Sequence, residues 1–139
     1  KTLVATMKAD GAYCALVSGG FTAFTAEIAA ALGFDENRAN TLLVAEGRLT
    51  GQVALPILGK EAKVDALQDI SARLGIIPTQ VLAVGDGAND LGMLALAGTG
   101  VALQAKPSVA AQCQVRVNHG DLTALLYLQG YAREEFAGL

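Results

Sequence analysis

Apolar residues along this sequence follow two alternating spacings, which predict strands and helices in turn. Short, uninterrupted apolar runs bounded by glycine or polar residues are typical of strands buried on both faces of a parallel sheet. Such runs predict strands over 13–17, 81–84 and 101–103, and a thin strand is expected over 115–117. Apolar residues three or four positions apart are typical of helices. This spacing predicts helices over 1–10, 22–32, 63–74 and 91–96, a short helix opened by Pro107, and a last helix that Asp121 caps and that runs through Tyr127.

The segments between these elements predict a hairpin and two irregular stretches. The runs 41–46 and 49–53 flank Gly47-Arg48 and favour a β-hairpin, although this turn signal is weaker than Asn-Gly. Residues 34–40 are polar and are expected to form a loop, and residues 56–59 a connector. Strands that alternate with helices of this length predict an α/β fold, in which a parallel sheet has helices on both faces and carries a β-hairpin insertion.

Two of the predicted helices carry an apolar face and end at a glycine. The face of the helix over 22–32 consists of Phe24, Ile28, Ala31 and Leu32. The stripe expected to be buried in the helix over 63–74 consists of Val64, Leu67, Ile70 and Leu74. Gly33 and Gly75 follow directly, and glycine is the usual residue at the left-handed position that ends a helix.

Composition and charge narrow the class of protein. A chain of 139 residues is long enough for one domain with a real core, so we expect a single domain over 1–139. The hydrophobic share of 53% argues against disorder, and the net charge of −3 without a basic block argues against nucleic acid as a partner. No apolar run approaches the ~20 residues that span a bilayer. Cys14 and Cys113 lie far apart and are expected to be reduced, with Cys14 buried, which favours the cytoplasm.

The most informative stretch is Gly85-Asp86-Gly87-Ala88-Asn89-Asp90, which follows the predicted strand over 81–84. Its two carboxylates, Asp86 and Asp90, lie at the carboxyl end of a buried strand, where open α/β sheets bind ligands. An acidic pair there suits Mg²⁺, which takes few protein carboxylates and keeps positions for water and phosphate oxygens. Alternatively, Asn89 or Asp90 caps the next helix. The spacing fits neither an EF-hand calcium loop nor a dinucleotide-binding fingerprint.

A second polar turn, Ser18-Gly19-Gly20, follows the strand over 13–17 and opens a helix. A hydroxyl and backbone amides at the positive end of a helix favour an anion, and phosphate suits them best. Alternatively, Ser18 is only a helix cap in a tight turn. A Ser-His-Asp triad is not favoured, because the only histidine, His119, lies in a late polar loop and is expected to be a plain surface residue.

Two lysines, Lys60 and Lys63, lie at the entry to the helix predicted over 63–74. Near a phosphate, a lysine would neutralise charge on the transferring group. The alternative is a solvated side chain, which is the usual state of a lysine at the start of a helix. Taken together, the serine turn, the lysine and the acidic pair favour a site that binds phosphate and a metal ion.

In combination, these stretches resemble the haloacid dehalogenase superfamily of phosphotransferases, and within it the phosphoserine phosphatases. Ala15–Phe21 resembles the second motif, Ala62-Lys63 the third, Val84–Asp90 the fourth, and Ala105-Lys106-Pro107 a later loop. The match covers essentially the whole chain. The resemblance implies the Rossmann-like core of that superfamily, with residues 1–139 as part of its core domain.

The resemblance also implies roles for the acidic turn. Asp86 would ligate Mg²⁺ directly, Asp90 would hold a metal-bound water, and Asn89 would form a hydrogen bond near the phosphate. The implied reaction is the hydrolysis of O-phosphoserine to serine and phosphate through a phospho-aspartyl enzyme, which is the last step of serine biosynthesis. The implied partner is therefore a small phosphate ester.

Roles for the phosphoryl group follow from the same resemblance. Ser18 and the amide of Gly19 would bind phosphoryl oxygens, and Gly20 would keep the backbone close. Lys63, and not Lys60, would contact the phosphate and the nucleophile.

One part of the family pattern is missing from this sequence. The first motif, Asp-x-Asp, occurs nowhere in it, and neither does the cap segment of the family. In the family, the strand with the first motif lies between the strands that correspond to 13–17 and 81–84. Because the chain begins with Lys1 inside a helical pattern, it resembles a piece of a longer protein. We expect either a complementing N-terminal segment in that position or an abnormally closed or homodimeric sheet, and an inactive isolated chain.

Two other functions remain open at this point. The chain could belong to another phosphatase of the superfamily that acts on a different small phosphate ester. It could also be a non-catalytic module that binds phosphate or a metal ion. P-type ion pumps carry a similar acidic motif, but the Ser-Gly-Gly turn and the lack of long apolar runs argue against a pump.

Overall fold

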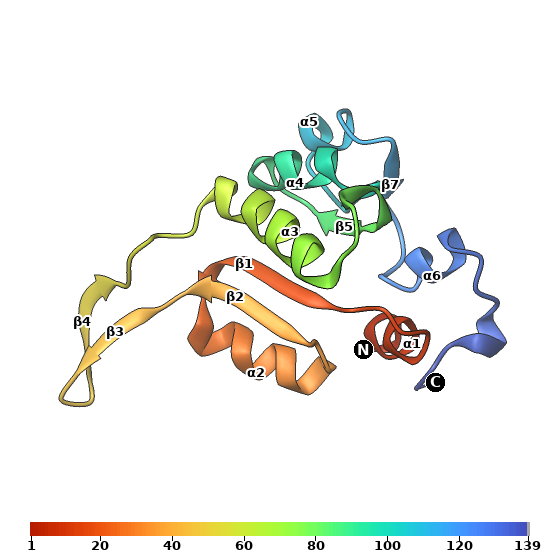
Figure 1. The fold of residues 1–139 in the computed structure, drawn as a ribbon. Coiled ribbons are helices and arrows are strands. Elements are labelled where there is room, and N and C mark those ends of the chain that lie inside the picture. Colours follow the sequence, from red (N-terminus) through yellow and green to blue (C-terminus); the bar gives the residue numbers. More distant parts are fainter. Residues whose placement is uncertain (139) are drawn as a thin grey trace. The chain divides into compact units, whose positions relative to one another are not determined.

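Parallel strands joined by helices make up most of the structure, a computed structural model that describes residues 1–138 (Figure 1). The chain divides into two units. One unit consists of Lys1–Leu58 and the segment from Leu122 onwards, and we call it the outer unit because it holds both ends of the sequence. The other unit consists of Gly59–Asp121, and we call it the central unit because it comes from the middle of the sequence. This division does not test the expectation of a single domain over 1–139, which stays a prediction. None of the helices in residues 1–138 is long and apolar enough to span a bilayer.

The outer unit is built around two parallel strands. Its elements are α1 (Thr2–Ala9), β1 (Ala15–Phe21), α2 (Thr22–Leu32), β2 (Glu36–Asn40), β3 (Leu42–Ala45), β4 (Arg48–Val53) and α6 (Ala124–Leu128). α2 connects β1 to β2 and packs against both strands (Figure 1). It ends at Gly33, whose φ of 85° lies in the left-handed region, as predicted. α6 has Thr123 at its N-cap position, so the prediction that Asp121 caps this helix is wrong.

The prediction of a loop over 34–40 is wrong, because residues 36–40 form β2. This strand pairs in parallel with β1, with Leu16 opposite Asn37 and Val17 opposite Arg38. Its polar side chains find partners, since the Thr25 hydroxyl donates to Asn37 Oδ1 at 2.8 Å. A polar sequence can form this strand because backbone pairing with β1 and side-chain hydrogen bonds stabilise it. Burial of apolar side chains contributes little to the stability of β2.

The apolar face predicted for α2 is not the face that the structure buries. Phe24 and Ile28 are 66% and 49% exposed, whereas Thr25 and Ala29 are buried. Among the described residues, α2 packs on a sheet of two strands, β1 and β2. This sheet buries one stripe of the helix and leaves the other side chains exposed. The hydrogen bond from Thr25 to Asn37 fixes which stripe it is.

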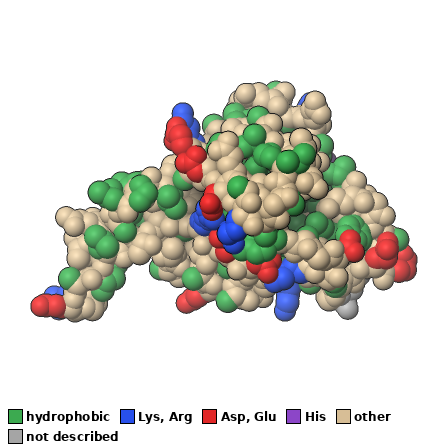
Figure 2. Space-filling model, in the orientation of Figure 1, with side chains coloured by type: hydrophobic (Ala, Val, Ile, Leu, Met, Phe, Trp, Pro, Cys, Tyr) green, Lys and Arg blue, Asp and Glu red, His purple; other side chains and the backbone are tan. Residues whose placement is uncertain are grey.

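The predicted hairpin is present as β3 and β4, and Ala45 pairs with Arg48 across a two-residue loop. The loop residues Glu46 and Gly47 have φ values of 51° and 74°. Positive φ at both positions is typical of the type I′ turn that matches the twist of paired strands. Hydrophobic side chains gather on the hairpin and on the connector that follows it (Figure 2). The exposed ones are Leu43, Val44, Leu49, Leu55 and Ile57.

The central unit holds a parallel sheet with the strand order β5-β6-β7. Its elements are α3 (Lys60–Leu74), β5 (Leu82–Gly85), α4 (Leu91–Leu96), β6 (Thr99–Leu103), α5 (Pro107–Ala110) and β7 (Val115–Val117). The buried core consists of Leu67, Ala83, Leu94, Ala102 and Cys113. The parallel α/β architecture predicted from the sequence is therefore confirmed.

α3 departs from its prediction in two respects. It begins at Lys60, three residues before the expected start, and ends at Gly75 as expected. Of the predicted stripe, Leu67 is buried but Leu74 is exposed. Small residues, Ala66 and Ser71, are buried instead, because α3 packs closely against α4.

Two glycines around the start of β6 allow backbones to touch. A Cβ at Gly98 would lie 1.9 Å from the carbonyl oxygen of Thr79, and one at Gly100 would lie 2.1 Å from that of Leu94. Neither position accepts any side chain without a backbone shift. The Gly98-Thr99-Gly100 stretch is therefore a packing requirement of the sheet.

β1 and β5 each have one strand partner within residues 1–138. β1 pairs with β2, and β5 pairs with β6. Direct pairing of β1 with β5, which would have contradicted the expectation of a missing strand, does not occur among the described residues.

Candidate active site

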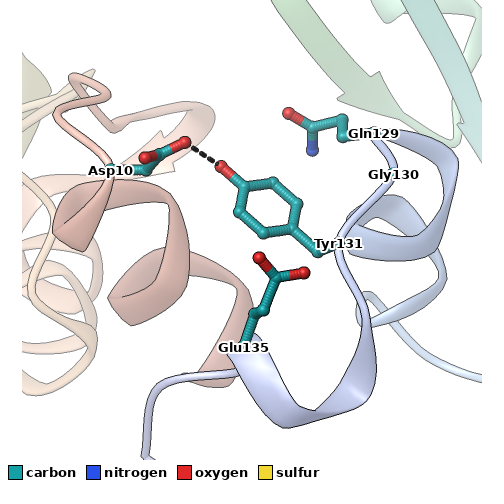
Figure 3. A pocket seen from close by; sticks show the side chains of 5 residues that line it. All are labelled: Asp10, Gln129, Gly130, Tyr131 and Glu135. Carbon is teal, nitrogen blue, oxygen red and sulfur yellow. Dashed lines mark hydrogen bonds between the residues drawn. The ribbon is translucent and has the colours of Figure 1, made fainter.

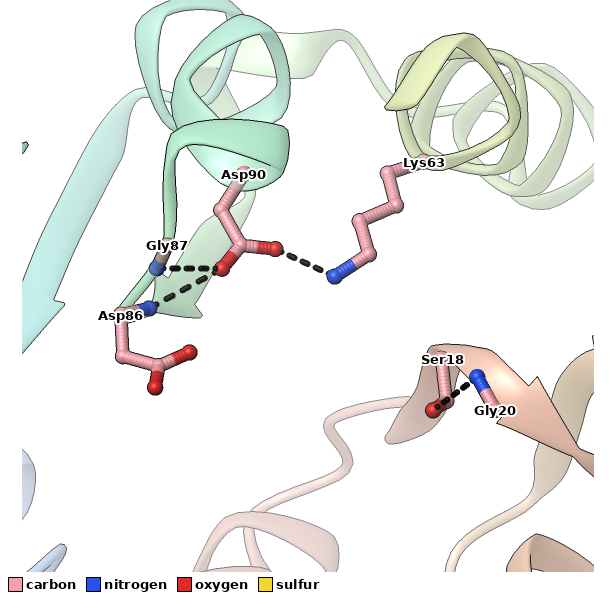
Figure 4. Close-up of polar contacts among 6 residues, drawn as sticks. All are labelled: Ser18, Gly20, Lys63, Asp86, Gly87 and Asp90. Atoms are coloured by element: carbon pink, nitrogen blue, oxygen red, sulfur yellow. Dashed lines mark hydrogen bonds and ion pairs between the residues drawn. The ribbon is translucent and has the colours of Figure 1, made fainter. Parts of the chain in front are cut away.

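The acidic turn at the end of β5 is organised by the carboxylate of Asp90. Its Oδ2 accepts hydrogen bonds from the amides of Asp86 and Gly87, both at 3.0 Å, and its Oδ1 pairs with Lys63 Nζ (Figure 4). Asp90 occupies the N-cap position of α4, but its side chain makes no capping bond there. The interpretation of Asp90 as a simple helix cap is therefore wrong, since its oxygens bind the turn before the helix.

Lys63 and Asp90 form a nearly buried ion pair, with side chains 12% and 4% exposed. Burial alone raises the pKa of Asp90. The hydrogen bonds from Lys63 and from the two turn amides outweigh burial, and they hold this pKa below its usual value. The carboxylate is thus charged at neutral pH and fixes the ammonium group of Lys63 beside the turn.

Side chains of the turn leave little room for a Cβ at two of its glycines, and at Gly85 the close neighbour is Asp90. A Cβ at Gly85 would lie 2.5 Å from both Cβ and Cγ of Asp90. A Cβ at Gly87 would lie 2.7 Å from Asn89 Oδ1. Gly85 therefore lets the backbone fold closely around the Asp90 carboxylate, whereas a Cβ at Gly87 would displace only the end of the Asn89 side chain.

The side chains of Asp86 and Asn89, by contrast, form none of the hydrogen bonds of this network. Both residues are exposed, and the Asp86 carboxylate accepts no hydrogen bond among residues 1–138 (Figure 4). An uncommitted carboxylate at the carboxyl end of a parallel strand fits Mg²⁺, which commonly takes only one or two protein carboxylates. Within residues 1–138, no group of three or more His, Cys, Asp or Glu side chains converges on one point. Among the described residues of this turn, Asp86 is therefore the carboxylate that no hydrogen bond occupies.

In the outer unit, the Ser18-Gly19-Gly20 turn interrupts the ladder of β1. Val17 pairs with Arg38 and Phe21 with Asn40, so β1 advances four residues while β2 advances two. Ser18 Oγ accepts the Gly20 amide at 3.0 Å (Figure 4). The extra residues bulge out of the ladder and are exposed at both glycines. Phe21, and not Ser18, holds the N-cap position of α2, so Ser18 is not a helix cap.

One residue of this region was missed by sequence reasoning. Asn40 is only 6% exposed, and its Nδ2 donates to the carbonyl oxygen of Gly19 at 3.0 Å and to that of Leu58 at 3.2 Å. Its Oδ1 accepts the Leu58 amide at 2.7 Å. Asn40 stands at the end of a polar run, where hydropathy patterns do not separate a buried asparagine from an exposed one.

Lys60 and His119 take no part in either turn. Lys60 is exposed, and its Nζ lies 3.7 Å from the carboxylate of the neighbouring Glu61. His119 is exposed, as predicted. Of the predicted site residues, the structure joins Lys63 and Asp90 directly and sets Asp86 and Asn89 beside them on one turn. It holds Ser18, Gly19 and Gly20 together on another.

A separate pocket lies in the outer unit (Figure 3). Its lining residues are Asp10, Gln129, Gly130, Tyr131 and Glu135. The hydroxyl of Tyr131 donates to Asp10 Oδ2 at 2.5 Å, and this bond raises the pKa of Tyr131. The contact ties the end of α1 to the C-terminal segment and includes none of the predicted site residues.

Comparison with known proteins agrees with the motifs. The chain is 44% identical over 135 residues to a phosphoserine phosphatase of Streptomyces coelicolor, covering 97% of this chain and 33% of that protein. It matches the unliganded crystal structure of a probable phosphoserine phosphatase from Vibrio cholerae with a TM-score of 0.86 and 41% identity, over 89% of this chain and 38% of that one.

A structure titled as a phospho-aspartyl intermediate analogue of phosphoserine phosphatase matches with a TM-score of 0.83 and 37% identity, over 90% of this chain and 60% of that one. The chain thus spans from a third to three fifths of the length of these relatives. The family model for haloacid dehalogenase-like hydrolases matches residues 1–95, which is more than half of the sequence. The chain therefore belongs to the haloacid dehalogenase-like hydrolase family.

Proposed function

We propose that this chain is part of a Mg²⁺-dependent phosphatase that hydrolyses O-phospho-L-serine to L-serine and phosphate. The observation that carries the proposal is the Lys63–Asp90 pair, held against the turn that presents Asp86. A fixed ammonium group next to an uncommitted carboxylate suits a transferring phosphoryl group with its metal ion. Phosphoserine as the substrate rests on the relatives, which are phosphoserine phosphatases at 37–44% identity.

Each predicted residue has a role in this proposal. Lys63 neutralises charge that develops on the phosphoryl oxygens, and Asp90 keeps its ammonium group in place. Ser18 and the Gly19 amide donate to phosphoryl oxygens, and Asn89 donates near the phosphate.

Asp86 would hold Mg²⁺ directly, and Asp90 would hold a water of the ion. When bound, the ion would neutralise phosphate charge and orient the ester. The lone pairs of Asp90 not engaged by Lys63 and the two amides remain for such a water.

The proposed reaction also needs a nucleophile. No Asp-x-Asp occurs in the 139 residues. We propose that a complementing segment, or a second chain in a homodimer, supplies the aspartate that accepts the phosphoryl group. One of the similar structures is titled as an analogue of a phospho-aspartyl intermediate, which is the chemistry that such an aspartate performs.

The proposed setting is serine biosynthesis in the cytoplasm. The two cysteines are free thiols, which is compatible with a reducing compartment, although Cys14 is only partly buried and the prediction of a buried Cys14 is wrong. The proposed partner is a small phosphate ester.

The test compares Lys63→Ala with Lys60→Ala in the protein made from the complete gene, assayed with phosphoserine and Mg²⁺. We expect Lys63→Ala to lose on the order of 10²–10³ in turnover, since a preorganised electrostatic contact is removed. Lys60→Ala is the matched control on the same helix, and its turnover should stay within about twofold because the side chain is 72% exposed.

Because Lys63→Ala leaves the buried Asp90 unpaired, thermal unfolding is measured in parallel, and Lys63→Arg serves as a variant that keeps the charge. Equal losses for Lys63→Ala and Lys60→Ala would contradict the role of Lys63. Turnover of another phosphate ester, without turnover of phosphoserine, would correct the substrate alone. No turnover of any ester would favour a non-catalytic module that binds phosphate or metal.

A further inference from the structure

The side chain of Asn40 is buried and forms hydrogen bonds at both ends. Its two Nδ2 hydrogens meet the carbonyl oxygens of Gly19 and Leu58, and its Oδ1 meets the amide of Leu58. This environment fixes the orientation of the amide group, since the nitrogen faces two acceptors and the oxygen faces a donor. Asn40 is thus a rigid donor aimed at one peptide of the Ser18-Gly19-Gly20 turn.

That peptide, between Gly19 and Gly20, is held from both sides. Its carbonyl oxygen accepts from Asn40, and its N–H donates to Ser18 Oγ at 3.0 Å. Because a peptide group is planar and trans, its C=O and N–H point in opposite directions. Fixing the carbonyl oxygen therefore fixes the direction of the N–H, and with it the partner of the serine hydroxyl.

Little else restrains this peptide. Glycine has the widest conformational freedom of all residues, so a Gly-Gly peptide can rotate at low cost. A Cβ at Gly19 would meet nothing within 4 Å, so no neighbouring group packs against that position. At Gly20 the nearest atom is Ser18 Oγ itself, at 3.2 Å from a Cβ. Among residues 1–138, the hydrogen bond from the Asn40 side chain restrains this peptide together with the ladder pairing of the next residue, Phe21.

The state of Ser18 follows from the plane of this peptide. When its Oγ accepts the Gly20 amide, the hydroxyl hydrogen is left to donate outward. If the peptide rotated, the Gly20 amide would leave Oγ and the Gly19 carbonyl could take the hydroxyl hydrogen instead. A carbonyl oxygen facing outward would also repel a phosphate.

We propose that Asn40 is a positioning residue, which holds the Gly19–Gly20 peptide so that Ser18 and the turn amides present donors to a phosphoryl group. The proposal rests on the proposed function for the role of the turn in binding phosphate. It assigns Asn40 an effect that passes through the Gly19 carbonyl and involves no contact with the ligand.

The test uses Asn40→Asp, Asn40→Ala and the matched control Asn37→Asp in the full chain. Asn40→Asp keeps an acceptor for the Leu58 amide but has no donor for Gly19. Asn37→Asp makes the same chemical change on the same strand and keeps the acceptor for Thr25. Two readouts are taken: the orientation of the Gly20 N–H in the ligand-free protein, from residual dipolar couplings, and the dissociation constant of inorganic phosphate, from amide shifts of residues 18–20.

We expect both Asn40 variants to reorient the Gly20 N–H and to weaken phosphate binding by about tenfold or more, which corresponds to the loss of one buried hydrogen bond. Asn37→Asp should change neither readout. A merely structural role through Leu58 predicts instead that both Asn40 variants lose stability but leave the orientation of the Gly20 N–H unchanged.

An unchanged Gly20 N–H orientation in Asn40→Asp and Asn40→Ala would overturn the inference, whatever happens to phosphate binding. The wild-type protein separates this failure from failure of the proposed function. If it binds no phosphate while the Asn40 variants still reorient the peptide, the positioning role stands and the phosphate role of the turn fails.

Discussion

At the scale of single residues, Asp90 shows how one carboxylate organises a site. It binds two amides of the turn that precedes it and the ammonium group of Lys63 from another helix. Breaking one side of such a buried pair commonly costs 3–5 kcal/mol, because the partner charge stays buried. The same residue therefore contributes to the stability of the central unit and to the placement of the lysine.

The close fit around Asp90 predicts a strong effect of Gly85→Ala. The added Cβ would lie 2.5 Å from the Asp90 side chain, so the turn or the carboxylate must move. We expect a loss of about 2 kcal/mol in the free energy of unfolding, which is typical of overpacking. Urea unfolding of the chain measures it. Gly19→Ala is the control, because a Cβ there meets nothing within 4 Å, and equal losses for the two variants would contradict the prediction.

Residue types with a chemical signature could be predicted from the sequence, and a residue without one could not. Asp86 follows a strand and Lys63 lies in the first turn of a helix, whereas Ser18, which was predicted at a strand end, lies within β1 at the break of its ladder. The role of Asn40 depends on the carbonyl oxygen of Gly19, twenty-one residues away. Since sequence patterns carry no information about such a pairing, this contact could only be found in the structure.

At the scale of elements, prediction succeeded where apolar burial forms the element. β5 and α4 are rich in apolar residues, and the structure places them within a residue of their predicted ranges. The prediction missed β2 because the stability of this strand comes from pairing with β1 and from polar partners such as Thr25. The prediction of the buried face of α2 was wrong because periodicity identifies an apolar stripe of a helix but does not show which elements pack against that stripe.

The connection of α1, β1 and α2 depends on Asp35, and it predicts a pH dependence. One oxygen of Asp35 accepts the Cys14 amide at 2.8 Å, and the other pairs with Lys8 Nζ at 2.8 Å. Lys8 also donates to the carbonyl oxygen of Gly33 at 2.8 Å. The hydrogen bond from Cys14, and then the contact with Lys8, holds the pKa of Asp35 below its usual value.

A carboxyl whose pKa is lower in the folded than in the unfolded chain stabilises the fold above the unfolded pKa, about 3.9 for Asp. That contribution is lost as the pH falls through the lower, folded value. We therefore expect Asp35→Asn to destabilise the chain at pH 7 by less than about 1 kcal/mol, since the pair is partly exposed, and to show a smaller stability loss between pH 6 and about pH 3 than wild type. Urea unfolding at both pH values is the measurement.

Asp65→Asn, at an exposed position of α3, is the matched control for the change in charge. It should leave the difference in unfolding free energy between the two pH values as in wild type. If Asp35→Asn and wild type lose the same stability on acidification, the assignment to Asp35 is wrong.

At the scale of the whole molecule, the strands β1 and β5 carry the turns of the site and have one strand partner each within residues 1–138. β5 and the first part of β1, Ala15-Leu16-Val17, are short apolar runs of the kind that is buried on both faces of a parallel sheet. The free edge of such a strand presents unpaired backbone groups and is a ready template for another strand. The edges that could accept a strand thus belong to the strands that end at Ser18-Gly19-Gly20 and at Asp86.

An added parallel strand beside β1 or β5 would have its carboxyl end on the same side as the strand with which it pairs. We therefore predict that a segment with an apolar run followed by Asp-x-Asp confers phosphoserine hydrolysis on this chain.

To test this prediction, the chain and the segment are mixed with Mg²⁺, and released phosphate is measured. The chain alone should release none above background, and the mixture should release phosphate in proportion to the complex formed. A segment whose first aspartate is replaced by asparagine is the control: it should bind equally well, seen as protection of β1 and β5 amides from hydrogen exchange, without hydrolysis. Turnover by the chain alone at the rate of the mixture would contradict the prediction, because the nucleophile would then lie within the 139 residues.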